Sequence, residues 1–426
     1  MDRREFLLNT AKAAGVTLPW WGLLPLSANA QQTPASKILV YYHLDGGPTH
    51  DLWTDPSVDP RYNLYTQQGL AIPGSGNLRW APIGLNTAFF TRFRDQCLVV
   101  NGVNSQSNSH DDGARCQETG KLAMGFAPIC ELHAAKAAGG MPAGWLLRDN
   151  GTVSAGIYPA TAIPDQNQLR AMIDPLAVNG TNDYIKRADF NKTVEARAAR
   201  LEALKANGVM LPKQSLITDA FIAGKEARVR LAAVANNIPT AFGPFPDLEV
   251  SLICAQSGIT AAIQASGGGF DTHGNVADND GANGSFARST TRLEYLWDEA
   301  ARRGIADRLH VVVAGEFSRT ALNGSNGNDH ANVGSGALIM LPPGTGLGNR
   351  VVGYTGPGHT SRAINPKTGA PDPNGVMLIP AHYHDALRTY LGIQPTNPTQ
   401  GLGVPANEKL DLFNPAMSTG HPTLTA

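Results

Sequence analysis

The chain has 426 residues, and its 34 Lys and Arg side chains nearly balance its 35 Asp and Glu side chains. Charged residues make up 16% of the sequence, whereas about 25% is typical of globular domains. A near-neutral chain with few charges lacks the basic excess of nucleic-acid-binding proteins, so we expect no nucleic-acid partner. Because 42% of the residues are hydrophobic, the chain can bury a sizeable core and is not disordered overall. The 46 Gly and 29 Pro residues show no collagen-like period and predict long loops.

Residues 1–30 have the features of a bacterial export signal. Arg3 and Arg4 precede a weakly apolar run, and Ala28-Asn29-Ala30 has the small-x-small pattern that signal peptidase accepts. Paired arginines before such a run are typical of twin-arginine signals. The run contains a lysine and two prolines, so it is a poor membrane-spanning helix. We expect cleavage near Ala30 and a periplasmic or secreted mature chain, residues 31–426, without a membrane span.

The four cysteines show none of the spacings of a zinc finger or a redox motif. After export, a disulfide between Cys116 and Cys130 is one reading. The other is four buried thiols, because a protein that folds in the cytosol before export folds reduced. The remaining two cysteines are Cys97 and Cys254.

The first half of the mature chain predicts a buried strand at 38–44, a short apolar run that ends in Asp45-Gly46-Gly47-Pro48. A second strand is predicted at 97–100. A helix should begin near Ser109, because Asp111 and Asp112 fill its first turn, where the helix dipole favours acids. Further on, we expect an insertion or cap at about 141–246, with helices at 183–206 and 213–236.

The second half alternates between helices and strands. The pattern predicts helices at 248–256, 285–303 and 381–391, and strands at 259–265, 309–314 and 337–341. Strands that alternate with helices favour an α/β fold, in which a mostly parallel central sheet is covered by helices on both faces. We therefore expect a single domain over 31–426.

Four predicted loops each combine a carboxylate with an imidazole: 45–51, 107–112, 270–274 and 327–331. In open α/β sheets, ligands bind beyond the carboxyl ends of the strands, where these loops should lie. Mixed oxygen and nitrogen donors suit Zn²⁺ or Mn²⁺ better than Ca²⁺. Taken singly, Asp-Gly and Asn-Asp are ordinary turn residues, and a loop histidine is more often a hydrogen-bonding residue than a ligand. Four such loops together predict a shared metal or catalytic site.

The motifs run in one order over nearly the whole mature chain. They are the loop 46–50, Ser109-His110 with 118–120, Phe270 to His273, Glu316 to Thr320, Asp329-His330 and the helix with His384. In these motifs the chain resembles an uncharacterised family of twin-arginine-exported bacterial proteins, catalogued as a domain of unknown function. That family is distantly similar to the alkaline phosphatase and sulfatase superfamily, so the resemblance implies an alkaline-phosphatase-like fold.

The superfamily binds two divalent metals with Asp and His side chains from strand ends, next to a Ser or Thr nucleophile at a helix N-terminus. Carried over by motif, the resemblance implies that Ser109 is the nucleophile. The guanidinium of Arg319 is expected to hold a substrate oxygen with two parallel hydrogen bonds. The alternative for Arg319 is a structural ion pair with Glu316. The implied metal ligands are Asp45, Asp271, His273, Asp329, His330 and His384. Asp51 is the alternative to Asp45, and His382 or His359 are the alternatives to His384.

The sequence therefore predicts an exported metal-dependent hydrolase of phosphate, sulfate or related esters, which uses zinc or manganese on a small-molecule or polymer ester. The rival reading is a non-catalytic secreted protein that keeps the fold and binds a partner or polymer through the loops at 55–82 and 342–376. A third reading is a protein whose metal is only structural. Neither a dinucleotide fingerprint after a strand nor a P-loop is present, so we expect no nucleotide cofactor.

Overall fold

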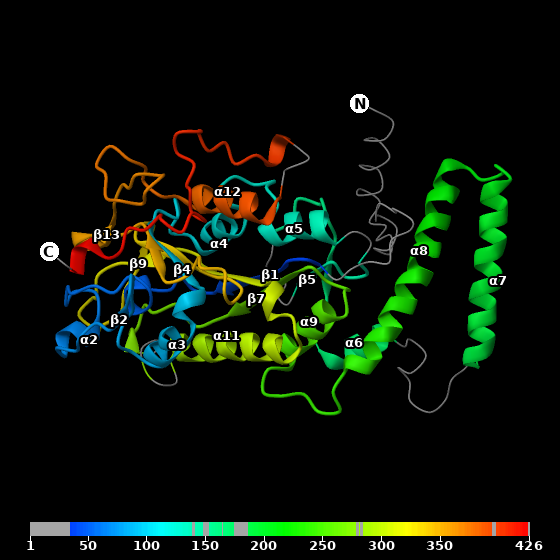
Figure 1. Cartoon of the computed structure of the whole chain (residues 1–426), viewed down its shortest axis with the longest axis horizontal. Helices are drawn as coiled ribbons and strands as arrows, with labels where there is room; N and C mark the ends of the chain where they lie inside the picture. Colours follow the sequence, from blue (N-terminus) through cyan, green and yellow to red (C-terminus); the bar gives the residue numbers. More distant parts are fainter. Residues whose placement is uncertain are drawn as a thin grey trace.

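An eight-stranded sheet in the order β12-β4-β11-β8-β1-β7-β5-β6 forms the centre of the molecule (Figure 1). This computed structural model describes residues 35–138, 141–147, 153–163, 165–173, 186–277, 281, 284–393 and 398–424. The predicted export signal, residues 1–30, lies outside the described residues.

The strands of the sheet are mostly parallel. Neighbouring strands pair in parallel throughout, except where β11 pairs with β4 and β8. The strands are β1 (Ile38–Leu44), β4 (Cys97–Val103), β5 (Trp145–Leu147), β6 (Ala160–Ala162), β7 (Ala262–Gly267), β8 (Leu309–Gly315), β11 (Ser335–Met340) and β12 (Arg350–Val352).

Helices cover both faces of the sheet, which confirms the predicted fold class (Figure 1). Alternate residues of β1 point to opposite faces, so Val40 and Tyr42 pack into one hydrophobic core, and Leu39 and Tyr41 into another. One face carries α3 (Asn86–Phe93), α9 (Pro246–Gln256) and α11 (Ser285–Arg302). The other carries α4 (His110–Thr119), α5 (Ile129–Ala137) and α12 (Pro380–Leu391).

A pair of long helices, α7 (Arg187–Ala206) and α8 (Pro212–Val234), projects from one end of the molecule (Figure 1). The shorter helix α6 (Gln166–Ile173) contacts α8. Within the expected insertion at 141–246, β5 and β6 join the edge of the central sheet. That range therefore supplies sheet strands as well as projecting helices.

Short elements surround the sheet. They are α2 (Leu64–Gln67) and three two-stranded ribbons: β2 (Gly74–Ser75) with β3 (Leu78–Arg79), β9 (Ser318–Arg319) with β10 (His330–Ala331), and β13 (Thr355–Gly356) with β14 (Thr360–Ser361). All four cysteines are buried and none forms a disulfide, so the second of the two cysteine readings holds and Cys116 is not bonded to Cys130.

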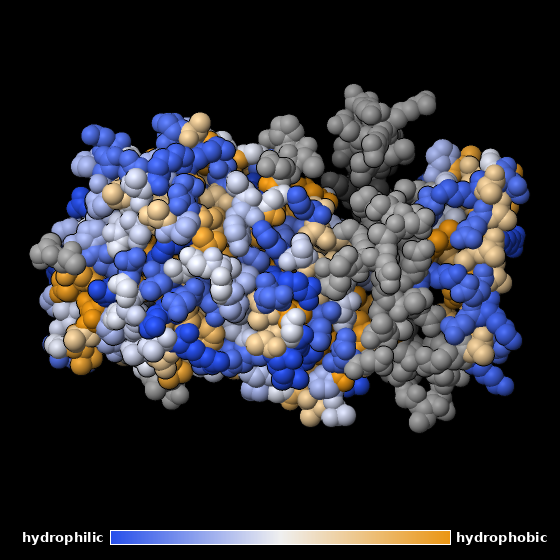
Figure 2. All heavy atoms as spheres, in the orientation of Figure 1, coloured by the Kyte–Doolittle hydropathy of each residue, from blue (hydrophilic) through white to orange (hydrophobic). Residues whose placement is uncertain are grey.

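The surface is mostly hydrophilic on the face that Figure 2 shows, with apolar residues gathered in small, separate groups. Among the described residues, no helix combines the length and the apolar character needed to cross a bilayer.

Candidate metal centre

Four strands end at the same edge of the sheet. β1, β7 and β8 are parallel, and β4 shares their direction because β4 and β8 both run antiparallel to β11. Leu44 lies in register with Gly267 and Gly315, the last residues of their strands. The loops that follow therefore leave the sheet side by side, and they carry the residues described below.

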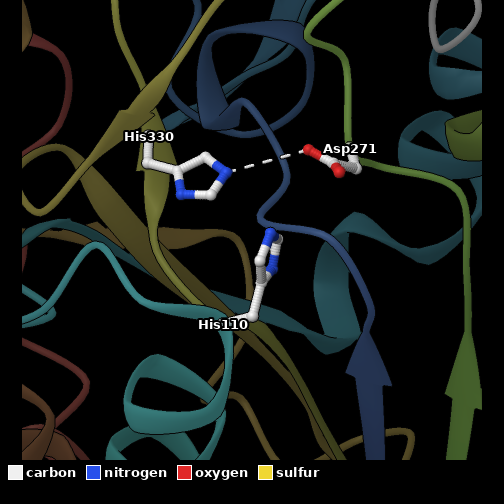
Figure 3. A group of neighbouring side chains, drawn as sticks. All are labelled: His110, Asp271 and His330. Atoms are coloured by element: carbon white, nitrogen blue, oxygen red, sulfur yellow. Dashed lines mark ion pairs between the residues drawn. The ribbon is translucent and has the colours of Figure 1, made fainter.

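The first group of potential ligands is His110, Asp271 and His330, whose ligand atoms lie within 4.8 Å of one another. His110 begins α4, Asp271 follows β7, and His330 lies in β10. Figure 3 shows both imidazole rings and the carboxylate turned toward a common space. His330 Nε2 lies 3.8 Å from Asp271 Oδ1. Three separate loops thus bring two nitrogens and one oxygen together.

Hydrogen bonds hold both histidines by their Nδ1 atoms. His330 Nδ1 lies 2.8 Å from the Asn108 carbonyl oxygen, which can only accept, so Nδ1 carries the proton. His110 Nδ1 is hydrogen bonded to the Glu316 carboxylate. In the neutral imidazole, this leaves Nε2 with the lone pair in each ring. Metal-binding histidines in proteins are oriented in this way by a carbonyl or a carboxylate.

A second group, His273, Asp329 and His330, shares His330 with the first. His273 Nε2 lies 2.9 Å from His330 Nε2 and 3.2 Å from Asp271 Oδ1. His273 Nδ1 is 3.7 Å from Asp329 Oδ1. The His273 side chain is 50% exposed and that of Asp329 is 77% exposed, so this side of the centre faces solvent.

A third group lies on the sheet side of the centre and consists of His43, Asp45 and Glu316. His43 Nε2 is 3.4 Å from Asp45 and 3.5 Å from Glu316. Burial lowers the pKa of His43, but Glu316, Glu118 and Asp45 outweigh burial and raise it above its usual value. Since Glu316 also contacts His110, it connects this group to the first.

The carboxylates of the centre differ in their electrostatic surroundings. Burial raises the pKa of Glu316, but hydrogen bonds from His43 and His110 outweigh burial, so its pKa is lowered and it stays ionised. By contrast, burial raises the pKa of Glu118 to about 7, and its Oε1 accepts a 2.8 Å hydrogen bond from Gln264. Glu118, which lies beside the centre, is therefore only partly ionised at neutral pH.

Arg319 is fully buried and does not pair with Glu316, so that alternative is wrong. Its Nε donates to the Gly47 carbonyl at 2.9 Å, and its NH2 group donates to the Gly46 carbonyl and to Asp271 Oδ1, the latter at 2.7 Å. Burial raises the pKa of Asp271, but the hydrogen bond and charge of Arg319 outweigh burial and lower it. The expected contact of Arg319 with a substrate oxygen is not supported, because the side chain is 0% exposed and its Nε and NH2 groups are engaged by these partners.

The loop after β1 approaches the loop after β7 very closely. Gly46 has a φ of +100°, and a Cβ there would lie 2.6 Å from the Asp271 amide nitrogen. Only glycine combines this backbone conformation with so close an approach. The Gly-Gly pair after β1 thus allows Arg319 to bond the first loop and the Asp271 carboxylate together.

Asn328 bonds the remaining ligand loops together. Its Nδ2 donates to Thr49 Oγ1 at 3.1 Å, and its Oδ1 accepts from Thr272 Oγ1 at 2.6 Å. All three side chains are at most 2% exposed. Thr272 lies between Asp271 and His273 in the sequence, and Asn328 directly precedes Asp329-His330, so this buried network fixes two ligand loops relative to the loop after β1.

Ser109 is exposed at the N-cap of α4, and its side chain makes no capping hydrogen bond. Its neighbours on both sides contact the centre, since Asn108 bonds His330 and His110 is a potential ligand. The helix thus begins directly after Ser109, where the sequence predicted its start, and the role of Ser109 as a nucleophile stays a prediction.

The structure does not bring His384 to the centre, which corrects the expectation that it is a ligand. His384 lies on α12, is 0% exposed, and its Nε2 donates to the Gln117 carbonyl at 2.7 Å. Gln117 is seven residues along α4 from His110, or about 10 Å of helix. Burial lowers the pKa of His384 to about 3. Its proposed substitutes also have other partners: His382 pairs with Glu408, and His359 with Asp51.

Three residues of the centre were not predicted as ligands: His43, His110 and Glu316. His110 and Glu316 both lie in motifs that the sequence analysis identifies, but the motif with His110 predicts a nucleophile at Ser109 and no metal ligand. His43 lies inside the apolar run of β1, where alternation alone gives it no special role. Only the register of β1 with β8 shows that it faces Glu316.

The donors present fit a divalent metal. They combine histidine nitrogens with carboxylate oxygens, the set that Zn²⁺ and Mn²⁺ accept. The Asp271 side chain is 50% exposed, so the centre is open to solvent on one side. Fold and site together define an α/β protein with a histidine- and carboxylate-rich centre at the carboxyl ends of its parallel strands.

Comparison with known proteins agrees with the resemblance stated from the motifs. Residues 222–346 match the profile of a family described as "Protein of unknown function (DUF1501)". The matched segment includes Asp271, Glu316, Arg319 and His330. The chain is thus similar to this family over the part that carries most of the centre. No curated protein matches the sequence.

The solved structures that resemble the chain include the following three. BT4656, solved with its substrate D-glucosamine-2-N,6-O-disulfate, is 8% identical over 90% of this chain and 81% of its own, with a TM-score of 0.38. A mutant of TAB5 alkaline phosphatase with Mg bound in its M3 site is 10% identical over 73% and 92%, with a TM-score of 0.31. The protein yidJ of Bacteroides fragilis, which carries a provisional sulfatase designation, is 10% identical over 92% and 80%, with a TM-score of 0.30.

Proposed function

We propose that this chain is a metal-dependent hydrolase of phosphate, sulfate or related esters. The observation that carries the proposal is the convergence of His110, Asp271 and His330 from three loops at one edge of the sheet. Structural metal sites are closed, whereas catalytic sites keep a position open for water or substrate. The half-exposed side chains of Asp271 and His273 therefore favour a catalytic site over a structural one.

The residues of this chain divide into two ligand sets. His110, Asp271 and His330 would hold one divalent ion, with His273 and Asp329 beside it. His43, Asp45 and Glu316 would hold the other. Zinc or manganese bound there would polarise the ester as a Lewis acid and stabilise the charge of an in-line displacement.

Ser109 is the proposed nucleophile. Its Oγ would attack the phosphorus or sulfur atom of the ester and displace the alcohol, and the ester formed on Ser109 would then be hydrolysed by water. The N-terminus of α4 carries a partial positive charge, which favours an anionic oxygen at that position. Arg319 has an indirect role in this proposal, because its guanidinium orients the Asp271 carboxylate and keeps that carboxylate ionised.

We also propose that the chain reaches the periplasm or the outside of the cell by twin-arginine export. The support is the Arg3-Arg4 pair before a weakly apolar run and the Ala28-Asn29-Ala30 pattern. Replacement of both arginines by lysine should leave the chain in the cytoplasmic fraction with its first thirty residues attached. Unchanged export of this variant would contradict the route.

Metal content and turnover of the purified protein test the proposed function. We expect at least one zinc or manganese ion per chain by elemental analysis, and hydrolysis of one or more members of a panel of phosphate and sulfate esters. Asp271→Asn and His330→Ala should each lower both metal content and turnover. Asp307→Asn, an exposed carboxylate in a turn before β8, serves as the control and should change neither.

The same experiment separates the rival readings. A metal content of less than about one ion per chain that neither ligand substitution changes would contradict both the metal centre and the proposed hydrolase. Full metal content without turnover of any ester would favour the non-catalytic binding protein. Turnover that survives Ser109→Ala unchanged would reject Ser109 as the nucleophile.

A further inference from the structure

A cavity of about 300 Å³ lies beside the candidate metal centre, between the end of β7 and the helices α9 and α11. The centre does not use the side chains that line it. These are Arg288, Ser289 and Arg292 of α11, Asp247 of α9, Tyr42 of β1 and Ser266 of β7. The residues that line the cavity thus carry two guanidinium groups, three hydroxyl groups and a single carboxylate.

The glycine run at the end of β7 forms the wall between this cavity and the centre. A Cβ on Gly267 would lie 2.4 Å from the Tyr42 hydroxyl and 3.0 Å from Ser289 Oγ, so only glycine leaves room for both hydroxyls at this position. A Cβ on Gly268, which also lines the cavity, would lie 3.6 Å from Asp45 Oδ2. The cavity and the ligand Asp45 are therefore separated by one stretch of backbone.

Both arginines are held in place by neighbours. Arg292 is bonded to Asp247 and lies over the Phe245 ring, with 5.0 Å between the guanidinium carbon and the ring centroid. Arg288 donates to Ser285 Oγ at 2.8 Å, and Ser285 donates to the Gly269 carbonyl at 2.6 Å. Guanidinium groups whose orientation is fixed in advance lose less freedom when they bind an anion.

We propose that this cavity binds an oxyanion group (sulfate, phosphate or carboxylate) carried by the part of the substrate that is not cleaved. Arginine recognises such groups with two parallel N–H donors, and the Tyr42 and Ser289 hydroxyls add neutral donors. Among the residues that line the cavity, two carry guanidinium groups and one carries a carboxylate. The link between this cavity and a substrate rests on the proposed function. The proposed hydrolase would then act on esters that carry a second anionic group.

The first test uses inorganic sulfate as the probe on protein stripped of metal by a chelator. We expect calorimetric titration to show sulfate binding that Arg288→Gln weakens by about tenfold or more, since it removes a charge-assisted pair. Arg288→Lys keeps the charge but not the paired donors, so its sulfate affinity should lie between that of the unchanged protein and that of Arg288→Gln. Arg302→Gln, an exposed arginine near the end of the same helix that does not line the cavity, is the matched control and should bind sulfate like the unchanged protein.

The second test uses metal-loaded protein and two esters, one with a single anionic group and one with a second, uncleaved sulfate. We expect Arg288→Gln to raise KM for the second ester about tenfold more than for the first. Sulfate binding that is absent, or equal in the Arg288→Gln and Arg302→Gln variants, would overturn the proposal. An equal change of KM for both esters would also overturn it.

The two proposals fail separately. Because the sulfate titration needs neither metal nor turnover, a protein without hydrolase activity can still show binding that depends on Arg288. Conversely, an active hydrolase whose stripped form binds no sulfate would keep the proposed function and lose this one.

Discussion

The buried side chain of Asn328 offers a sharp test of how the ligand loops are held. It is 1% exposed, and its two hydrogen bonds join Thr49 to Thr272. Asn328→Ala leaves both threonine hydroxyls buried without this partner. Each unsatisfied buried group costs about 1–3 kcal/mol, so with two such groups we expect the free energy of unfolding to fall by about 2–6 kcal/mol.

The same substitution should also weaken metal binding. Groups that orient metal ligands typically contribute a factor of about 10–100 in metal affinity, and Asn328 fixes the loops of Asp271, His273 and His330. We would measure the zinc dissociation constant by competition with a chelator, and the stability of the metal-free protein by urea unfolding. Thr272→Val, which removes one hydroxyl without a change of shape, should give a smaller loss of both quantities.

Asn86→Ala is the matched control. Asn86 is also fully buried, and its Nδ2 donates to the Leu52 and Ala81 carbonyls at 3.0 and 3.2 Å, but it belongs to none of the ligand loops. It should lose comparable stability and keep its zinc affinity. If both variants lose stability and both bind zinc within about twofold of the unchanged protein, the reasoning about loop positioning is refuted.

Three further predictions follow from single residues. Ser109→Ala should abolish ester hydrolysis and leave the metal content unchanged in elemental analysis. A loss of metal would show that Ser109 contributes to metal binding and would contradict its role as the nucleophile alone. Arg319→Leu removes the guanidinium that bonds two loop carbonyls and Asp271, so urea unfolding should show a loss of about 2–4 kcal/mol. A loss below about 1 kcal/mol would contradict the structural role. Burial lowers the pKa of His133 to about 4 in the folded protein. The contribution of this residue to the free energy of unfolding is therefore greatest above about pH 6.5 and falls as the pH is lowered to about 4, because the unfolded chain takes up the proton first. His133→Gln should therefore reduce the slope of unfolding free energy against pH, measured between pH 4.5 and 6, by about 1 kcal/mol per unit. An unchanged slope would contradict the buried neutral state.

The central part of the fold was predictable because its signals are local. The apolar run at 38–44 marks a strand buried on both faces, and Leu293, Leu296 and Trp297 mark the buried face of α11. The helices α3 and α5 were missed. Their N-caps are Leu85 and Pro128, which make no side-chain capping bond, so the sequence carries no start signal.

Part of the centre was also predictable, since loops at the ends of parallel strands must meet at one edge. This reasoning identified Asp271 and His330, which do meet. It could not place His384, because only the packing of α12 against the far end of α4 decides where that side chain points. Nor could it identify the Arg319–Asp271 pair, whose members are 48 residues apart in the chain.

The central claim is that these loops hold a divalent metal between His110, Asp271 and His330. Diffraction data collected at the zinc and manganese absorption edges from crystals grown with each metal would test it most directly. The account predicts an anomalous peak about 2.0–2.2 Å from the ligand atoms of these side chains, and its loss in Asp271→Asn crystals. Crystals without a peak among these three residues, or with a peak that Asp271→Asn leaves in place, would contradict the account.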